Sequence, residues 1–326
     1  MNLVPINPKI YDPKVEKFPI RKGYGDGLLS IGETDHRIVA LSADLVESTY
    51  THHFAKKFPE RFIQNGIAEQ SMASVASGMA AMGKIPFMAS YAMFSPGRNW
   101  EQIRTSICYN FTNVKIVGSH AGVTVGPDGG SHQALEDIAL TRVLPRMMVI
   151  VPCDHIEARK ATIAAAGYEG PVYIRLCREN TAVVTAEETP FELGKAQCFF
   201  ASPQPVVGII AIGALVYEAM VAAKQLEEEG IPVKVLNMPT VKPLDEEAVL
   251  ELAKEVKAIV TVEEHQKKGG LGGAVAEYLS AAHPTKLAYV GMNDEFGQSG
   301  EPMELVKYFH LDSTGIIAAV KDVLKS

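Results

Sequence analysis

Two imidazoles and a carboxylate lie on one glycine-rich stretch of the chain, residues 119–133. They are His120, Asp128 and His132. A histidine can donate a hydrogen bond, accept one and titrate near neutral pH, and a carboxylate accepts hydrogen bonds from hydroxyl groups. This set of side chains suits a site that handles substrate hydroxyl groups and a developing oxyanion.

Two other interpretations of this stretch are open from the residues alone. Metal binding is the first, although the spacing matches no zinc pattern and no cysteine is near. The second is a structural loop whose polar residues only cap the neighbouring elements.

A further candidate is a single carboxylate, Glu69, in the first turn of a helix predicted from Ala68 to about Gly83. The side chains of this helix are nearly all small, so another backbone or a ligand can approach it closely. An acid in a first turn also complements the positive end of the helix dipole, and that plain role is open too.

These residues must be positioned by a parallel α/β sheet, because short apolar runs alternate with helical segments. Residues 119–133 follow one of the predicted strands, and open α/β sheets bind ligands at the carboxyl ends of their strands. In the first half of the chain we predict strands at 37–41, 85–89, 114–118, 147–151 and 172–175, and helices at 21–33, at 68–83, around Trp100, from about 134 and from 154.

The same alternation restarts after a hinge at residues 187–190. The predicted strands are 206–212, 233–236, 258–262 and 287–290, and helices are predicted from 214, 245 and 270 and at the end of the chain. The fold class is therefore α/β, with two tandem parallel-sheet domains. We place an irregular N-terminal arm at 1–20, the first domain at 21–186 and the second at 190–326.

The composition is that of an ordinary soluble protein, with 47% hydrophobic and 21% charged residues in a chain of 326. The net charge of −7, without a dense Lys/Arg cluster, argues against nucleic acid or an anionic membrane as a partner. No secretory signal is visible, and the longest apolar run, 206–217, is too short to span a bilayer. The four cysteines, without a Cys-x-x-Cys motif, favour reduced thiols and a cytoplasmic location.

Two glycine motifs are rejected as ligand loops. Residues 269–274 follow a predicted strand, but a dinucleotide loop beginning at Gly270 would need a small residue where Val275 stands. The sequence Gly25-Asp26-Gly27 matches a diphosphate-binding motif of thiamin enzymes, yet the Asn-Asn pair that completes this motif is absent, and the glycines lie inside a predicted helix.

Taken together, the motifs resemble the transketolase family. The resemblance rests on Gly-Ile-Ala-Glu-Gln at 66–70, on His120, Asp128-Gly129 and His132-Gln133 at their spacing, on Ser-Ala-Asp-Leu at 42–45 and on Cys-Arg-Glu-Asn at 177–180, where the family usually has Ser-Arg-Gln-Asn. It extends from about Arg21 to the end of the chain.

The resemblance implies that the first domain binds the pyrimidine ring of thiamin diphosphate and that the second is the transketolase C-terminal domain. The family's diphosphate-binding domain, which carries the magnesium ligands, would come first and is missing here. The chain therefore looks like the C-terminal half of a split transketolase. We expect it to share thiamin diphosphate with an N-terminal transketolase subunit that holds the magnesium, to use sugar phosphates as substrates, and to assemble as a heterotetramer.

Roles are carried over residue by residue from this resemblance. Glu69 matches the glutamate that hydrogen-bonds the coenzyme's pyrimidine, and His132 matches the histidine beside the reacting centre. Asp128 corresponds to the carboxylate that binds the donor's 2-hydroxyl group. The implied coenzyme contacts are completed by Asp44, Leu45, Tyr91 and Phe94, and the implied sugar-phosphate contacts are Arg21, Ser48, His120 and Arg178.

Three alternatives to a transketolase are weighed. Deoxyxylulose-phosphate synthase shares several motifs, but its pattern has arginine at the position of His120. The β subunit of a 2-oxo acid dehydrogenase has a different loop in place of residues 126–132. A catalytically silent regulatory partner would have no need of Glu69 together with His120, Asp128 and His132.

Overall fold

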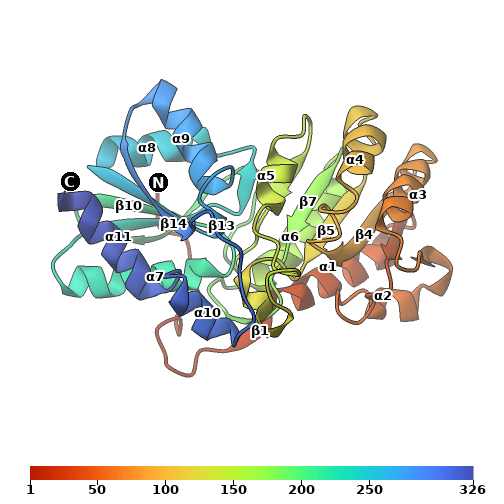
Figure 1. Cartoon of the computed structure of the whole chain (residues 1–326), viewed down its shortest axis with the longest axis horizontal. Coiled ribbons are helices and arrows are strands. Elements are labelled where there is room, and N and C mark those ends of the chain that lie inside the picture. The colour runs from red at the N-terminus through yellow and green to blue at the C-terminus, as the bar shows by residue number, and fades with distance from the viewer. Residues whose placement is uncertain (326) are drawn as a thin grey trace.

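The structure is a computed structural model that describes residues 1–325; residue 326, the last of the predicted second domain, lies outside the described residues. Two large β-sheets stand side by side, each covered by helices on both faces, and a third sheet of two short strands accompanies them (Figure 1). Within residues 1–325, none of the helices combines the length and the apolar character needed to cross a membrane. The α/β architecture predicted from the sequence is confirmed.

The first sheet has seven strands, and all but the edge strand β12 run parallel. Its five central strands are buried because helices cover both faces. In spatial order they are β12 (Thr240–Lys242), β6 (Met148–Ile150), β7 (Val172–Arg175), β5 (Lys115–Ser119), β4 (Ile85–Tyr91), β2 (Ile38–Ser42) and β3 (Phe62–Gln64).

The helices of this half are divided between the two faces of the sheet. One face is covered by α1 (Ile20–Thr34) and α6 (His155–Gly167), whose buried side chains share a core with β2, β4, β5, β6 and β7. The other face is covered by α3 (Glu69–Ala81) and by the π-helical turn η2 (Ile103–Tyr109). Shorter elements complete this half: α2 (His52–Lys57), η1 (Pro59–Arg61), α4 (Trp100–Gln102), η3 (Val123–Asp128) and α5 (Asp137–Arg142).

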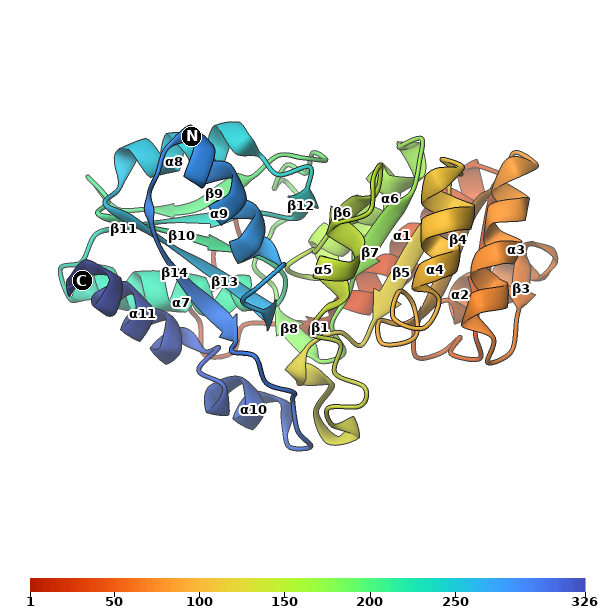
Figure 2. The same ribbon diagram turned by 45° about the horizontal axis from the view of Figure 1, so that its top comes forward.

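The second sheet has five strands, four of them parallel, in the order β14 (Lys286–Met292), β13 (Ala258–Gln266), β10 (Val207–Ala211), β11 (Val233–Asn237) and β9 (Gln197–Ala201). One face is covered by α7 (Leu215–Glu228) and α11 (Ser313–Lys325), and the other by α8 (Glu246–Glu255) and α9 (Leu271–Ala282) (Figure 2). The helix α10 (Pro302–Tyr308) lies against η3 of the first half.

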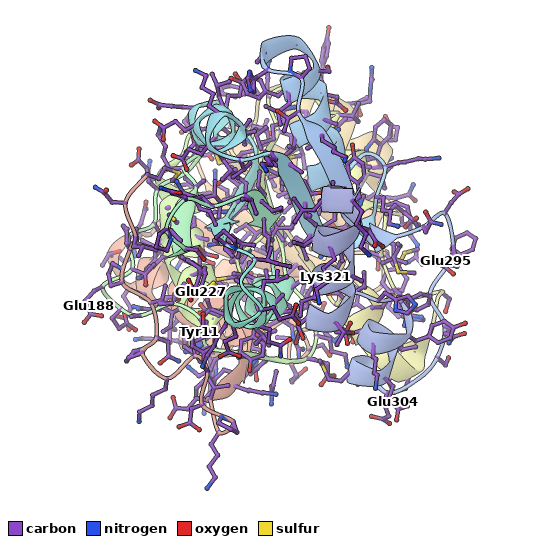
Figure 3. The ribbon with its side chains drawn as sticks, turned by 90° about the vertical axis from the view of Figure 1, so that its left-hand side faces the viewer. Tyr11, Glu188, Glu227, Glu295, Glu304 and Lys321 are labelled. Atoms are coloured by element: carbon purple, nitrogen blue, oxygen red, sulfur yellow. The ribbon has the colours of Figure 1, made fainter. Side chains whose placement is uncertain are left out.

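The N-terminal arm lies on the second half of the chain. Leu3 bridges to Cys198, and Tyr11 lies beside α7, with Lys224 Nζ 4.7 Å from its ring centroid (Figure 3). The end of the arm is not irregular as predicted, because β1 (Lys17–Pro19) pairs antiparallel with β8 (Asn180–Ala182). A three-residue strand carries too short a pattern to be visible in the sequence.

The remaining differences from the sequence prediction concern short or atypical elements. The helix predicted from about 134 begins at Asp137, and the helix around Trp100 turns after three residues into the π-helix η2. The strand β12 was not predicted; it leaves the second half of the chain and pairs with β6, so the two halves share a sheet. The boundary near residue 190 stays a prediction.

Candidate active site

The candidate residues lie at one edge of the seven-stranded sheet, where its parallel strands end. The loop after β2 carries Asp44, Leu45 and Ser48, the loop after β4 follows Tyr91, and the loop after β5 starts at His120. Because β2, β4 and β5 are neighbours in parallel register, their carboxyl ends bring the three loops together.

Glu69 is buried, with an exposed fraction of 1%, in the first turn of α3. Its Oε2 accepts a hydrogen bond of 2.7 Å from Arg98 Nη1, and its backbone oxygen accepts one of 3.1 Å from Asn99 Nδ2. The chain enters α3 through Gly66, whose φ of 63° lies in the left-handed region that glycine adopts without strain. The buried carboxylate of Glu69 is thus paired with Arg98, which lies on the loop after β4.

Aromatic and imidazole rings form a continuous stack beside this carboxylate. The rings of Tyr91 and His120 are parallel within 22° at 3.8 Å between centroids, and Tyr91 and Phe94 are parallel within 15° at 6.0 Å. The ring of His132 meets Phe94 edge-on at 5.6 Å. The guanidinium of Arg98 lies 4.7 Å from the Phe94 centroid, so the stack connects Glu69 to both histidines.

His120 has an unusual backbone conformation and a strongly lowered pKa. Its φ of 53° places a non-glycine residue in the left-handed region, and its Nδ1 lies 3.0 Å from Ser119 Oγ. Burial and the nearby charges of Arg21, Arg178 and His132 lower the pKa of its imidazole to about 3. The ring is therefore neutral at neutral pH and can donate one hydrogen bond and accept another.

This pKa gives a testable pH dependence. Between about pH 6.5 and about pH 3 the unfolded chain protonates His120 while the folded chain does not, so the free energy of unfolding falls as the pH falls. We expect His120→Gln to remove this contribution, which amounts to at most about 1.4 kcal/mol per pH unit. The measurement is urea unfolding of parent and variant across that range. His36→Gln, at an exposed position, is the matched control. If the free energy of unfolding of His120→Gln depends on pH as steeply as that of the parent, the lowered pKa of His120 is contradicted.

A group of basic and polar residues borders the imidazole. Arg21 donates through Nη1 to the backbone oxygen of Ser48 and through Nη2, at 2.7 Å, to that of Arg178. Arg178 in turn donates to the backbone oxygen of Val125 and lies 3.9 Å from an oxygen of Asp128. The structure therefore brings together Arg21, Ser48, Arg178 and Asp128, which lie far apart in the sequence.

Asp44 and Leu45 lie in the same region without contacting that group directly. Asp44 is exposed with a φ of 61°, and its backbone N–H donates to Gln64 Oε1 at 2.9 Å. The backbone N–H of Leu45 donates to Ser42 Oγ at 3.2 Å. These contacts fix a turn at the end of β2, but they bring neither residue against Glu69.

Three residues at this edge were not named by the sequence analysis. They are Arg98, the partner of Glu69; Tyr50, whose ring lies 5.5 Å from the Arg21 guanidinium; and Ser119, the neighbour of His120. Arg98 could have been noticed as a basic residue close to Tyr91 and Phe94 in the sequence. Nothing in the sequence pairs it with Glu69, which lies 29 positions earlier. Residues 1–325 contain no group of three or more His, Cys, Asp or Glu side chains arranged to hold a metal ion.

Comparison with known proteins matches the same two halves of the chain. The transketolase pyrimidine-binding domain matches residues 16–183, and the transketolase C-terminal domain matches residues 196–316. A putative transketolase C-terminal section from Methanocaldococcus jannaschii is 45% identical, over 94% of this chain and 96% of its own length. A 6-deoxy-6-sulfo-D-fructose transketolase subunit from Clostridium sp. is 41% identical, over 96% of this chain and 97% of its own length.

The fold agrees with a solved structure of a relative. A split-gene transketolase, described as an inactive β4 tetramer, superposes with a TM-score of 0.88 at 45% identity and covers 94% of this chain and 99% of its own. These relatives match over nearly their whole lengths, and both domain types are present in the expected order. The chain therefore belongs to the transketolase family and corresponds to the C-terminal subunit of a split transketolase.

Proposed function

We propose that this chain is the pyrimidine-binding subunit of a thiamin-diphosphate-dependent transketolase. Together with a separate diphosphate-binding subunit it transfers a two-carbon ketol group from a ketose phosphate to an aldose phosphate. The observation that carries this proposal is the setting of Glu69, a buried carboxylate in a first helical turn beside a stack of aromatic and imidazole rings.

The residues present fit the pyrimidine half of the coenzyme. A flat heterocycle packs favourably on aromatic side chains such as Tyr91 and Phe94, and a ring nitrogen finds a hydrogen-bond partner in Glu69. The Arg98 guanidinium lies against Phe94 and donates to Glu69, so Glu69 already accepts a hydrogen bond beside an aromatic ring. When bound, thiamin diphosphate supplies the carbon nucleophile that carries the ketol group.

The chain's own residues then have distinct tasks. Glu69 would hydrogen-bond the ring nitrogen of the pyrimidine and exchange a proton with it. His132, whose ring meets Phe94 edge-on, exchanges hydrogen bonds with the substrate oxygens at the reacting centre. Asp128, which is exposed on the same loop, accepts a hydrogen bond from a donor hydroxyl group.

The diphosphate and its magnesium ion are assigned to the partner subunit. A diphosphate needs a metal ion and oxygen ligands around it, and Gly25-Asp26-Gly27 lies inside α1 rather than in a loop after a strand. An exposed face of α3, formed by Gln70, Ser71, Ser74, Val75 and Gly78, is available for a close contact with another chain. We propose a heterotetramer of two such pairs. The four cysteines are buried free thiols, which suits a cytoplasmic setting.

The phosphate of the sugar is assigned to Arg21, Ser48, His120 and Arg178. Within residues 1–325, Nε of Arg21 is buried and makes no hydrogen bond, so this guanidinium has an unused donor. Arginine is well suited to bind phosphate because its donors form a planar fork. The Clostridium relative is named for a sulfo sugar, in which an anionic sulfonate takes the place of a phosphate. The experiment below therefore includes a sulfonated donor beside the phosphorylated one.

We expect His120→Ala or Arg178→Ala to weaken the use of phosphorylated donors, with KM rising by about tenfold or more, as for the loss of a hydrogen bond to a charged group. Hydroxypyruvate, which has no phosphate, should be affected much less. The measurement is ketol transfer by the complex with its partner, with phosphorylated and sulfonated sugar donors compared with hydroxypyruvate.

Arg37→Ala is the matched control, because Arg37 is an exposed arginine at the opposite, amino end of β2. If a variant impairs hydroxypyruvate and phosphorylated donors equally, the phosphate assignment is wrong. If the parent complex shows no ketol transfer with any donor, the chain is a non-catalytic partner.

A further inference from the structure

Three consecutive ionisable residues are buried at the end of β13, in the second half of the chain. Glu263, Glu264 and His265 have exposed fractions of 1%, 3% and 0%. Charged groups are rarely buried without a purpose, because their removal from water costs free energy. The proposed chemistry uses none of the three.

Each of these side chains binds a different backbone segment. Glu263 accepts hydrogen bonds from the N–H groups of Leu271 and Gly272, at 2.7 and 2.8 Å, and thereby caps α9 within its own domain. His265 Nε2 accepts one of 3.3 Å from the N–H of Ala139 in α5. Glu264 alone reaches the loop that carries the candidate active-site residues.

The contact between Glu264 and that loop is close. Its Oε1 accepts a hydrogen bond of 2.6 Å from the N–H of Thr124. The carboxyl carbon also lies against Gly122, where a Cβ atom would meet it at 2.2 Å. Gly122 has a φ of 87°, so both the backbone conformation and the space at this position require glycine.

A second contact fixes the far end of the same loop. Gln133 is buried, with an exposed fraction of 2%, and its Nε2 lies 3.2 Å from the Val123 oxygen, 3.3 Å from the Gly126 oxygen and 2.9 Å from the Gln298 oxygen. The first two acceptors belong to the loop, and the third belongs to the segment that precedes α10. Figure 2 shows α10 and this segment running beside the loop after β5.

The loop between these contacts has no regular hydrogen-bonding ladder to hold it. Its 3₁₀ turns are interrupted at Gly126, where φ is 76° and ψ is −116°. Asp128 and His132 both lie on this part of the chain. Their positions therefore depend also on groups outside the loop. Arg178, from the first half of the chain, donates to the Val125 oxygen, and the second half supplies Glu264 and the Gln298 oxygen.

We propose that Glu264 and Gln133 are positioning residues that lock residues 122–133 to the C-terminal domain, and so present Asp128 and His132 to the substrate. The C-terminal domain thus influences the reaction by fixing the conformation of residues 122–133 in the other domain. The contribution to catalysis rests on the function proposed above, whereas the locking of the loop does not.

The locking is tested by amide hydrogen exchange on the chain by itself. We expect Glu264→Ala to speed exchange across residues 122–133 by at least ~10-fold, as for the loss of a hydrogen bond to a charged group. Glu263→Ala is the matched control: it removes the neighbouring buried carboxylate, and faster exchange should appear at Leu271 and Gly272 instead. Unchanged exchange in 122–133 of a folded Glu264→Ala would overturn the proposal.

Gln133→Glu tests the second contact and serves also if Glu264→Ala does not fold. It keeps the size of the side chain but replaces the donor that faces three carbonyl oxygens by a further acceptor. We expect the same faster exchange in residues 122–133, and an unchanged pattern would equally overturn the proposal.

The catalytic consequence is measured in the complex with the partner subunit. We expect kcat to fall about tenfold or more, since small displacements of positioning groups have effects of this size. The half-saturating concentration of thiamin diphosphate should stay within about twofold, because Glu69, Tyr91 and Phe94 lie outside the locked loop. Faster exchange with a parental kcat would overturn the positioning role, and an inactive parent complex would overturn the proposed function while leaving the locking intact.

Discussion

Glu69→Gln is expected to lower ketol transfer by the assembled enzyme by at least ~10²-fold, the usual effect of removing a group that transfers a proton. A carboxyl group can hold a proton or release it, whereas the amide cannot exchange one with a ring nitrogen in this way. Coenzyme binding should change less than turnover, because the aromatic contacts of Tyr91 and Phe94 remain. The measurement is kcat for the complex, beside its half-saturating thiamin diphosphate concentration.

The fold should survive this substitution. Gln has nearly the same shape as Glu, and its amide oxygen can still accept the hydrogen bond from Arg98. The thermal midpoint of the variant is therefore the internal check, and Glu60→Gln, at an exposed position in η1, is the matched control. Activity of Glu69→Gln within a factor of two of the parent would remove Glu69 from its proposed role.

Much of this arrangement could be predicted because its signals are local. The strands β2, β4, β5 and β7 are built on short apolar runs, since a parallel sheet is buried on both faces. The helix α3 begins at Glu69, within one residue of its predicted start, and Gly83, near its predicted end, has a left-handed φ of 84°. Loops after parallel strands must share an edge, so the sequence also indicated where His120 and Tyr91 would lie.

What the sequence could not indicate depends on contacts between distant segments. No local pattern shows that β12 crosses to pair with β6, because three residues carry no periodicity. The partnership of Glu69 with Arg98 and that of Glu264 with Thr124 join groups 29 and 140 positions apart. The π-helical turn η2 likewise replaces an ordinary helix where packing on α3, not propensity, decides the geometry.

The largest expected effect is the dependence of this chain on a second one. Under the proposed function, this chain supplies a carboxylate, aromatic rings and histidines for the pyrimidine end of the coenzyme, and the partner subunit supplies the ligands of the diphosphate. A coenzyme held at one end loses most of its charge-assisted contacts, so its affinity should fall by several kcal/mol, or at least about a hundredfold. We therefore expect the isolated chain to bind thiamin diphosphate weakly and to catalyse nothing.

The central claim is that coenzyme binding and ketol transfer need both subunits. Calorimetric titration with thiamin diphosphate and magnesium tests this need most directly. It is run on the purified chain and on its complex with the diphosphate-binding subunit. A ketol-transfer assay is performed on the same two samples. We expect tight binding and turnover only for the complex. Tight binding and full turnover by this chain alone would contradict it.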